Sequence, residues 1–130
     1  MPAHTRTERL LIVDDETELL DALCDALRDA GFDAIGCAVP GDALAAVRGG
    51  RFALLLSDQM MPGMSGTELL RRARQVEPEL VGLIMTGQGS PQAEAEARAA
   101  GAVGLIRKPF RMRQVLPILE QALGAGGAVR

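Results

Sequence analysis

The stretch Leu10-Leu11-Ile12-Val13-Asp14-Asp15-Glu16 decides the fold, because four apolar residues run directly into three acidic ones. An apolar run without alternation is typical of a strand buried on both faces, as in the interior of a parallel sheet. Acidic side chains are rarely buried without a partner, so we expect the strand to end where Asp14 begins. Two carboxylates then lie at the carboxyl edge of a central strand, where open α/β sheets bind their ligands.

The neighbouring carboxylates of Asp14 and Asp15 favour a bound cation. Two carboxylates about 4 Å apart repel each other by roughly 4 kcal/mol at an effective dielectric constant of about 20. A hard cation removes this repulsion, and oxygen ligands together with water suit Mg²⁺. The sequence therefore predicts a magnesium site at the end of the first strand.

Composition favours one globular domain in the cytoplasm. The chain has 130 residues, of which 48% are hydrophobic and 24% charged, with a net charge of −3. The hydrophobic fraction is too high for a disordered chain, and the negative net charge does not fit a nucleic-acid-binding surface. No apolar run approaches the length of a membrane span. Cys24 and Cys37 could form a disulfide, but two unpaired buried thiols fit a cytosolic protein better. The only histidine, His4, is expected in solvent and leaves no partner for a Ser-His-Asp or zinc site.

Alternating apolar and helix-forming segments predict five strands and five helices. Glycine interrupts the second and fifth strands, which favours edge positions for them, whereas the fully apolar first and third strands belong in the middle. We expect Pro117 to kink the last helix or displace its start. The expected strands are residues 10–13, 33–38, 52–57, 81–85 and 102–107, and the expected helices are residues 16–30, 40–49, 66–77, 91–100 and a last helix ending near residue 123.

Short βα units require right-handed crossovers and a parallel sheet covered on both faces. The expected fold is therefore a single doubly wound, flavodoxin-like α/β domain with five parallel strands in the order 2-1-3-4-5 and five helices. Residues 1–8 are expected to form a polar lead-in, residues 9–123 the domain, and residues 124–130 a Gly/Ala-rich tail or a truncated linker.

In this strand order five chemically active side chains meet at one edge of the sheet. Asp14, Asp15 and Asp58 converge between the first and third strands, and the fourth and fifth strands deliver Thr86 and Lys108. Phosphoryl transfer needs mainly positioning and charge neutralisation, and an aspartate can be the covalent acceptor. The acids would hold Mg²⁺ while one of them acts as nucleophile, and the lysine and hydroxyl would receive phosphoryl oxygens.

Asp14-Asp15, Asp58, Thr86 and Lys108-Pro109-Phe110 together resemble the receiver domain of two-component response regulators. Residues 61–66 and 100–102 are similar to the same family, and the resemblance covers about residues 9 to 123. It implies that Asp58 accepts a phosphoryl group from a partner histidine kinase or phosphotransfer protein.

The same resemblance implies a role for each neighbour of Asp58. Asp15 and Asp58 would bind Mg²⁺ directly together with the main-chain carbonyl of Met60, and Asp14 would act through water. Lys108 would pair with Asp58 and then with the phosphoryl oxygens. Thr86 would donate to a phosphoryl oxygen, assisted by the backbone N–H groups of Met60 and Gly87, and the bond before Pro109 would be cis.

Thr86 and Leu105 would form the switch that changes the surface of the fourth helix, fifth strand and last helix. Leu105 stands where the family often has an aromatic residue, and Arg111 stands where a capping acid or serine would favour the last helix. We therefore expect an atypical output surface, read by a downstream protein or output domain, in a monomer or weak dimer. Such a domain is no enzyme beyond self-directed phosphotransfer and autodephosphorylation.

Several alternatives stay open at this point. The chain could be a module of a hybrid histidine kinase, which would be an enzyme, or of a multidomain regulator. A small-substrate aspartyl phosphatase would need an acid where Met60 stands. A flavin carrier would need a phosphate-binding loop in place of Asp14-Asp15-Glu16, and aromatic residues for the ring. For single residues, Asp15 could cap the first helix, Thr86 could simply end a strand, and Lys108 could lie on the surface.

Overall fold

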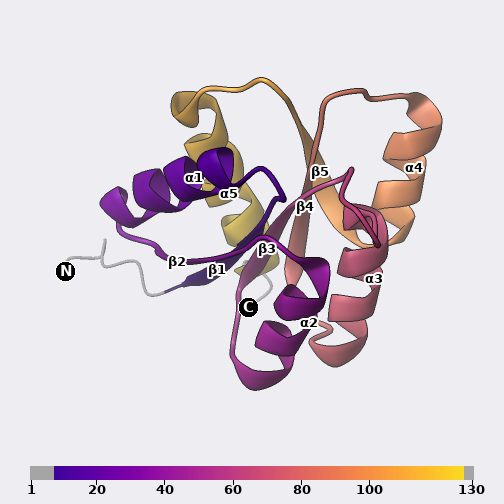
Figure 1. Cartoon of the computed structure of the whole chain (residues 1–130), viewed down its shortest axis with the longest axis horizontal. Coiled ribbons are helices and arrows are strands. Elements are labelled where there is room, and N and C mark those ends of the chain that lie inside the picture. The colour runs from indigo at the N-terminus through magenta and orange to yellow at the C-terminus, as the bar shows by residue number, and fades with distance from the viewer. Residues whose placement is uncertain (1–7, 128–130) are drawn as a thin grey trace.

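Five parallel strands form the centre of the structure, in the order β2-β1-β3-β4-β5 (Figure 1). The computed structural model describes residues 8–127. The strand order, the alternation of five strands with five helices and the edge positions of β2 and β5 confirm the predicted fold. The elements are β1 (Arg9–Val13), α1 (Thr17–Asp29), β2 (Asp33–Cys37), α2 (Pro40–Gly49), β3 (Leu54–Asp58), α3 (Gly66–Val76), β4 (Val81–Thr86), α4 (Pro91–Ala99), β5 (Ala102–Arg107) and α5 (Met112–Gly127).

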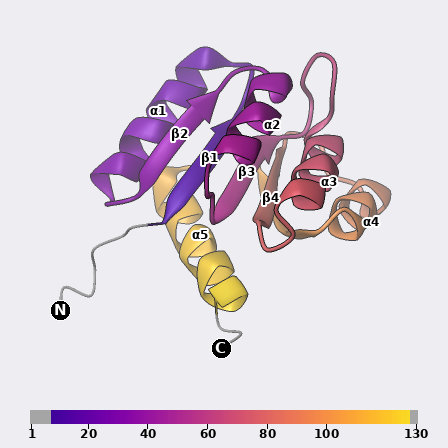
Figure 2. The same cartoon turned by 90° about the horizontal axis from the view of Figure 1, so that it is seen from below.

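Helices cover both faces of the sheet, so the central strands are buried on both sides. Alternate residues of β1 point to opposite faces: Leu10 and Ile12 pack with α1 and α5, while Leu11 and Val13 pack with α2, α3 and α4. Figure 2 shows β2, β1, β3 and β4 side by side in this order. Burial on both faces explains why the strand sequences are apolar without alternation.

The register of the sheet places the ends of β1 and β3 next to each other. Val13 pairs with Ser57, so Asp14 and Asp58, the next residue of each strand, are neighbours at the carboxyl edge. At the other side of β3, Asp58 pairs with Met85 of β4. The strand pairing by itself therefore brings the first acids together with the end of β4.

The helix α4 is attached to the sheet by little apolar surface. Among its residues only Ala97 is buried, and Ala100 just beyond its end adds a second small side chain. This agrees with the sequence pattern, in which only alanines form the apolar face of that helix. Since stabilisation scales with buried apolar area, α4 is weakly held.

The last helix extends beyond its expected end. It runs to Gly127, four residues beyond the expected end at Leu123, and it includes Pro117 without a displaced start. Arg111 precedes the helix, and its backbone N–H donates to Gln114 Oε1 at 2.8 Å. Gln114 thus makes one of the two hydrogen bonds of a capping box. The side chain of Arg111 has no acceptor and cannot make the other.

Smaller expectations are corrected or lie outside the described residues. The third strand begins at Leu54 rather than at Phe52, which is buried just before it. Cys24 and Cys37 are free thiols, but Cys37 is only half-buried. The expected lead-in, including His4, and the end of the expected tail fall almost wholly outside residues 8–127. Within that range, no helix combines the length and apolarity that crossing a bilayer requires.

Candidate functional site

Three carboxylates meet at the carboxyl edge of β1 and β3. Asp14 directly follows β1, Asp58 ends β3, and oxygens of Asp14, Asp15 and Asp58 lie within 4.8 Å of one another. Asp14 and Asp58 are buried, whereas Asp15 is exposed. The predicted convergence of the three acids is confirmed, and the cluster opens to solvent on the side of Asp15.

Asp14 is fixed in place by backbone and side-chain hydrogen bonds. Its N–H donates to the Cys37 carbonyl at 3.2 Å, and its Oδ1 accepts the Glu16 N–H at 2.9 Å. Its Oδ2 accepts from Lys108 Nζ at 3.1 Å. Both oxygens of this fully buried carboxylate are therefore engaged.

Lys108 places its ammonium among the acids from the far side of β4. Its Nζ lies 3.1 Å from Asp14 Oδ2, 3.1 Å from Asp58 Oδ1 and 3.1 Å from Glu16 Oε1. Its backbone N–H donates to the Thr86 carbonyl at 2.9 Å, and the bond from Lys108 to Pro109 is cis, as expected. The surface-lysine alternative is therefore wrong, and Glu16 is a partner that sequence reasoning missed.

Burial and the contacts of Lys108 with the acids together shift the pKa values of Asp58 and Lys108. Burial and the nearby Asp14 raise the pKa of Asp58, and the contact with Lys108 offsets them only in part. Burial lowers the pKa of Lys108, but hydrogen bonds to Asp14, Asp58 and Glu16 outweigh it and hold this pKa above its usual range. The charged form of Lys108 is stabilised by three carboxylates, whereas Asp58 shares its single cationic neighbour with two other acids.

Thr86 ends β4 at the same edge, but its hydroxyl turns to the following loop. Its Oγ1 donates to the Gln88 carbonyl at 2.8 Å and accepts the Gln88 N–H at 3.2 Å. Gly87 lies between these two residues. Leu105 of β5 lines the same surface hollow of about 400 Å³ as Thr86, so the two predicted switch residues are neighbours.

The loop after Asp58 is held close to β3. Gln59 Oε1 accepts from the Thr67 N–H at 2.8 Å and from Thr67 Oγ1 at 3.0 Å. A Cβ at Gly66 would lie 2.3 Å from the Asp58 carbonyl oxygen, so only glycine allows this approach. Met60 lies in this loop with its side chain 77% exposed. The predicted backbone groups of Met60 and Gly87 thus belong to the two loops that follow β3 and β4.

The donor set suits a hard divalent cation. Carboxylate oxygens are the ligands that Mg²⁺ prefers, and the exposed side of the cluster leaves room for the waters that it usually keeps. The cluster of Asp14, Asp15 and Asp58 therefore fits a magnesium ion.

Residues 10–120 match the family model described as response regulator receiver domain. The chain belongs to the response regulator receiver family. It is thus a signalling phosphoacceptor module of two-component systems, and the acidic cluster is consistent with the Mg²⁺ site of receivers. Membership implies a histidine kinase as the class of partner.

Curated relatives and solved structures share this receiver domain. The transcriptional regulatory protein FixJ of Bradyrhizobium diazoefficiens is 34% identical over 122 residues, which are 92% of this chain and 58% of FixJ. The response regulator receiver protein CpdR of Brucella abortus is 29% identical over 116 residues, which are 89% of this chain and 97% of CpdR. A CheY-like receiver domain protein from Methanospirillum hungatei JF-1 superposes with a TM-score of 0.89 at 33% identity, covering 94% of this chain and 98% of that one.

Many relatives are longer than this receiver domain. The chain spans about half the length of several curated relatives that it matches, including FixJ. The activity and partners of a whole protein therefore do not follow from the receiver domain alone.

Proposed function

We propose that Asp58 accepts a phosphoryl group from a phosphohistidine in a Mg²⁺-dependent transfer, and that phosphorylation switches the surface of α4, β5 and α5. One observation carries this proposal. Asp58 lies between two further carboxylates and the ammonium of Lys108, which is 3.1 Å away. This arrangement supports the proposed grouping of a nucleophile, a cation site and a donor for phosphoryl oxygens around one point.

Asp58 is the best-suited nucleophile of the three acids. Asp14 has one oxygen bound to the Glu16 N–H and the other to Lys108, and it is fully buried. Asp15 is exposed at the rim of the cluster, where a metal ion and its waters have access. These differences support the roles in which Asp15 binds the ion directly and Asp14 acts through water.

In the proposed transfer, an oxygen of Asp58 attacks the phosphorus while the bond from phosphorus to the histidine nitrogen breaks. The electron pair of that bond stays on the imidazole nitrogen, which takes up a proton, and a mixed anhydride forms on Asp58. Lys108 and the backbone N–H groups of Met60 and Gly87 donate to the phosphoryl oxygens. When bound, Mg²⁺ neutralises charge on those oxygens, with Asp15, Asp58 and the Met60 carbonyl as its protein ligands.

The proposed switch follows from the two hydrogen bonds between Thr86 and Gln88. To donate to a phosphoryl oxygen, the Thr86 hydroxyl has to leave the Gln88 carbonyl, and this releases the loop before α4. Leu105 can then fill part of the hollow beside Thr86. Because α4 is held by few buried side chains, a small change at this loop can shift the helix.

The rest of the proposal concerns the context of the domain. We infer a histidine kinase or phosphotransfer protein as phosphodonor in the cytoplasm, and a downstream protein or output domain as receiver of the signal. The domain would act as a monomer or weak dimer, without contacts of its own to nucleic acid or membrane. It could stand alone or be part of a hybrid histidine kinase or multidomain regulator. Since Met60 stands where a small-substrate aspartyl phosphatase would need a second acid, that function is not favoured.

The experiment is incubation with Mg²⁺ and phosphoramidate, followed by intact-mass measurement. The native protein is expected to gain one phosphoryl group, and the gain is expected to disappear without Mg²⁺ and in Asp58→Asn. Asp21→Asn, which removes an exposed acid of α1, is the matched control and should behave like the native protein. An unmodified native protein, or an equal gain in Asp58→Asn, would refute the proposal.

A further inference from the structure

The ammonium of Lys108 has as many charged neighbours as it has N–H bonds. Its Nζ lies 3.1 Å from oxygens of Asp14, Glu16 and Asp58. A lysine ammonium has three N–H donors and no acceptor. It donates hydrogen bonds to Asp14 and Glu16 and forms an ion pair with Asp58. The position of Nζ therefore depends on Glu16 as well as on the two aspartates.

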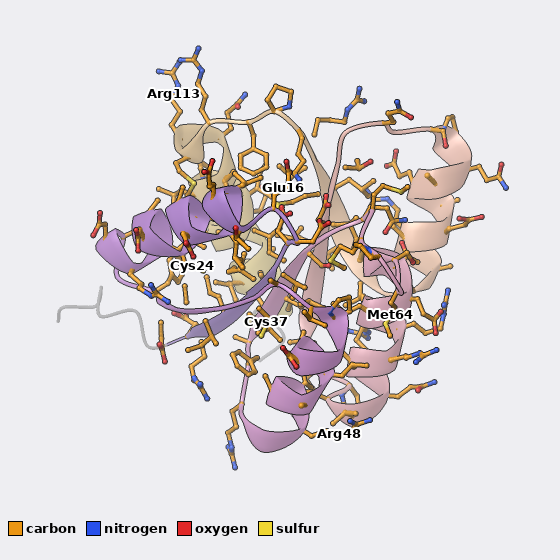
Figure 3. All side chains as sticks on the ribbon, in the orientation of Figure 1. Glu16, Cys24, Cys37, Arg48, Met64 and Arg113 are labelled. Carbon is orange, nitrogen blue, oxygen red and sulfur yellow. The ribbon has the colours of Figure 1, made fainter. Side chains whose placement is uncertain are left out.

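Glu16 differs from the two aspartates in its position relative to solvent. The side chains of Asp14 and Asp58 are 0% and 10% exposed, whereas that of Glu16 is 67% exposed. Figure 3 shows Glu16 at the carboxyl edge of the sheet, near the N-terminal end of α1. Glu16 thus holds the ammonium from the outside, and without it one N–H bond of Lys108 would face water.

The backbone of Glu16 is fixed, which gives its side chain a defined starting point. Its N–H donates to Asp14 Oδ1 at 2.9 Å, and its carbonyl accepts from the Leu20 N–H at 2.9 Å. Glu16 is the N-cap residue of α1, but its side chain makes no capping hydrogen bond. Most N-cap side chains satisfy the first turn of their helix, whereas this one extends to Lys108. The contact with Lys108 is therefore separate from the start of the helix.

We propose that Glu16 is a positioning residue for phosphoryl transfer, which holds the Lys108 ammonium from the solvent side so that one N–H bond points to Asp58. This inference rests on the proposed function of Asp58. During transfer the N–H bond on the side of Asp58 is directed to a phosphoryl oxygen, while Asp14 and Glu16 keep the other two. The ammonium then needs no large displacement to reach the reacting group.

Glu16 has two separable effects on the reaction. As an acceptor it orients Lys108, which affects the rate constant at saturating phosphodonor. As a negative charge it repels an anionic phosphodonor, which affects the donor concentration that gives half of this rate. Glutamine keeps the acceptor and removes the charge, whereas alanine removes both, so the two variants separate positioning from charge.

The experiment measures phosphorylation by phosphoramidate at saturating Mg²⁺, with intact mass against time and varied donor concentration. We expect Glu16→Ala to lower the maximal rate constant by about two- to fivefold, the size of effect expected for the loss of one partly exposed hydrogen bond, and Glu16→Gln, which keeps an acceptor, to stay close to the native value. Glu18→Ala, which removes an exposed acid from the same turn, is the matched control and should keep the native maximal rate constant.

A second measurement reads the position of Lys108 without any reaction. Lys108 is the only lysine of the chain, so its side-chain ammonium and ε-methylene groups give single NMR signals that need no assignment among lysines. Glu16→Ala is expected to shift these signals and to increase the motion of the ε-methylene group. Glu16→Gln should retain most of the native shift and order.

The outcomes separate this inference from the proposed function. If the native protein takes up no phosphoryl group, the proposed function of Asp58 fails, and the proposed role of Glu16 fails with it. If the native protein is phosphorylated, a native maximal rate constant in Glu16→Ala, or an equal loss in Glu16→Gln, overturns the role of Glu16 alone. Lysine signals that do not respond to Glu16→Ala also overturn it.

Discussion

Lys108 Nζ lies 3.1 Å from Asp58 Oδ1, although β4 separates the strands from which the two residues come. The lysine side chain therefore spans the end of β4, directly above the loop that Thr86 begins. Through this ion pair, we expect a change of charge on Asp58 to act on the loop that leads to α5. The strand order thus brings Asp58 into contact with the residue that begins the loop between β5 and α5.

The raised pKa of Asp58 predicts how stability depends on pH. Because the pKa is higher in the folded than in the unfolded protein, the stabilising contribution of this group is present below its unfolded pKa and is lost as pH rises through the folded pKa. Without Mg²⁺, Asp58→Asn should therefore raise the free energy of unfolding at pH 7, and the difference should shrink on acidification towards pH 4. Urea unfolding at both pH values measures it.

Asp21→Asn serves as the control for Asp58→Asn, since it removes an exposed carboxylate outside the cluster. It should change the free energy of unfolding little at either pH. A native protein that is more stable than Asp58→Asn at pH 7 would contradict the conclusion that burial and the nearby Asp14 destabilise the charged form of Asp58.

Magnesium should stabilise the fold by occupying the acidic cluster. A ligand that binds only the folded state adds about 2.7 kcal/mol to the free energy of unfolding at a concentration 100 times its dissociation constant. We expect this increase in the native protein and the loss of most of it in Asp15→Asn, measured by urea unfolding at constant ionic strength. Glu18→Gln should retain it, and an undiminished increase in Asp15→Asn would argue against the site.

Gly66 and Gly41 offer a matched test of the loop after Asp58. Gly66→Ala would place a Cβ 2.3 Å from the Asp58 carbonyl oxygen, so we expect it to lower the free energy of unfolding by about 1–3 kcal/mol. Gly41→Ala meets nothing within 4 Å inside α2, and alanine favours a helix by up to about 1 kcal/mol. The two variants should therefore shift the urea midpoint in opposite directions. Equal shifts would show that Gly66 is not closely packed.

Thr86→Val should release the loop that follows β4. Valine keeps the shape of threonine but loses both hydrogen bonds to Gln88, each worth about 1 kcal/mol. We expect faster hydrogen exchange at the Gln88 amide, by about fivefold or more, and native exchange in Thr86→Ser. Unchanged exchange at Gln88 in Thr86→Val would mean that this hydroxyl does not hold the loop.

The fold could be predicted because its strongest signals are local. The apolar runs before Asp14 and Asp58 identify the two central strands, and glycine in β2 and β5 identifies the edges. Once the strand order is given, the parallel register alone brings the acids together. The end of α5 was mistaken because a Gly/Ala sequence carries little helix signal, since glycine disfavours helices.

The finer contacts of the site depend on information that the sequence pattern does not contain. The contact between Glu16 and Lys108 depends on the path of two long side chains from different parts of the sheet edge. Glu16, the third acid after β1, is conspicuous in the sequence, but the sequence does not indicate that it contacts Lys108. By contrast, the hydrogen bonds between Thr86 and Gln88 are local, and a threonine two residues before a loop N–H could have indicated them.

The most direct test of the central claim is to identify the phosphorylated residue itself. After incubation with Mg²⁺ and phosphoramidate, borohydride reduction converts an aspartyl phosphate to homoserine, and peptide mass spectrometry locates the converted residue. We predict conversion at Asp58 alone. Conversion at Asp14 or Asp15 instead, or no conversion at any aspartate of a folded, Mg²⁺-treated protein, would contradict the role of Asp58 as phosphoacceptor.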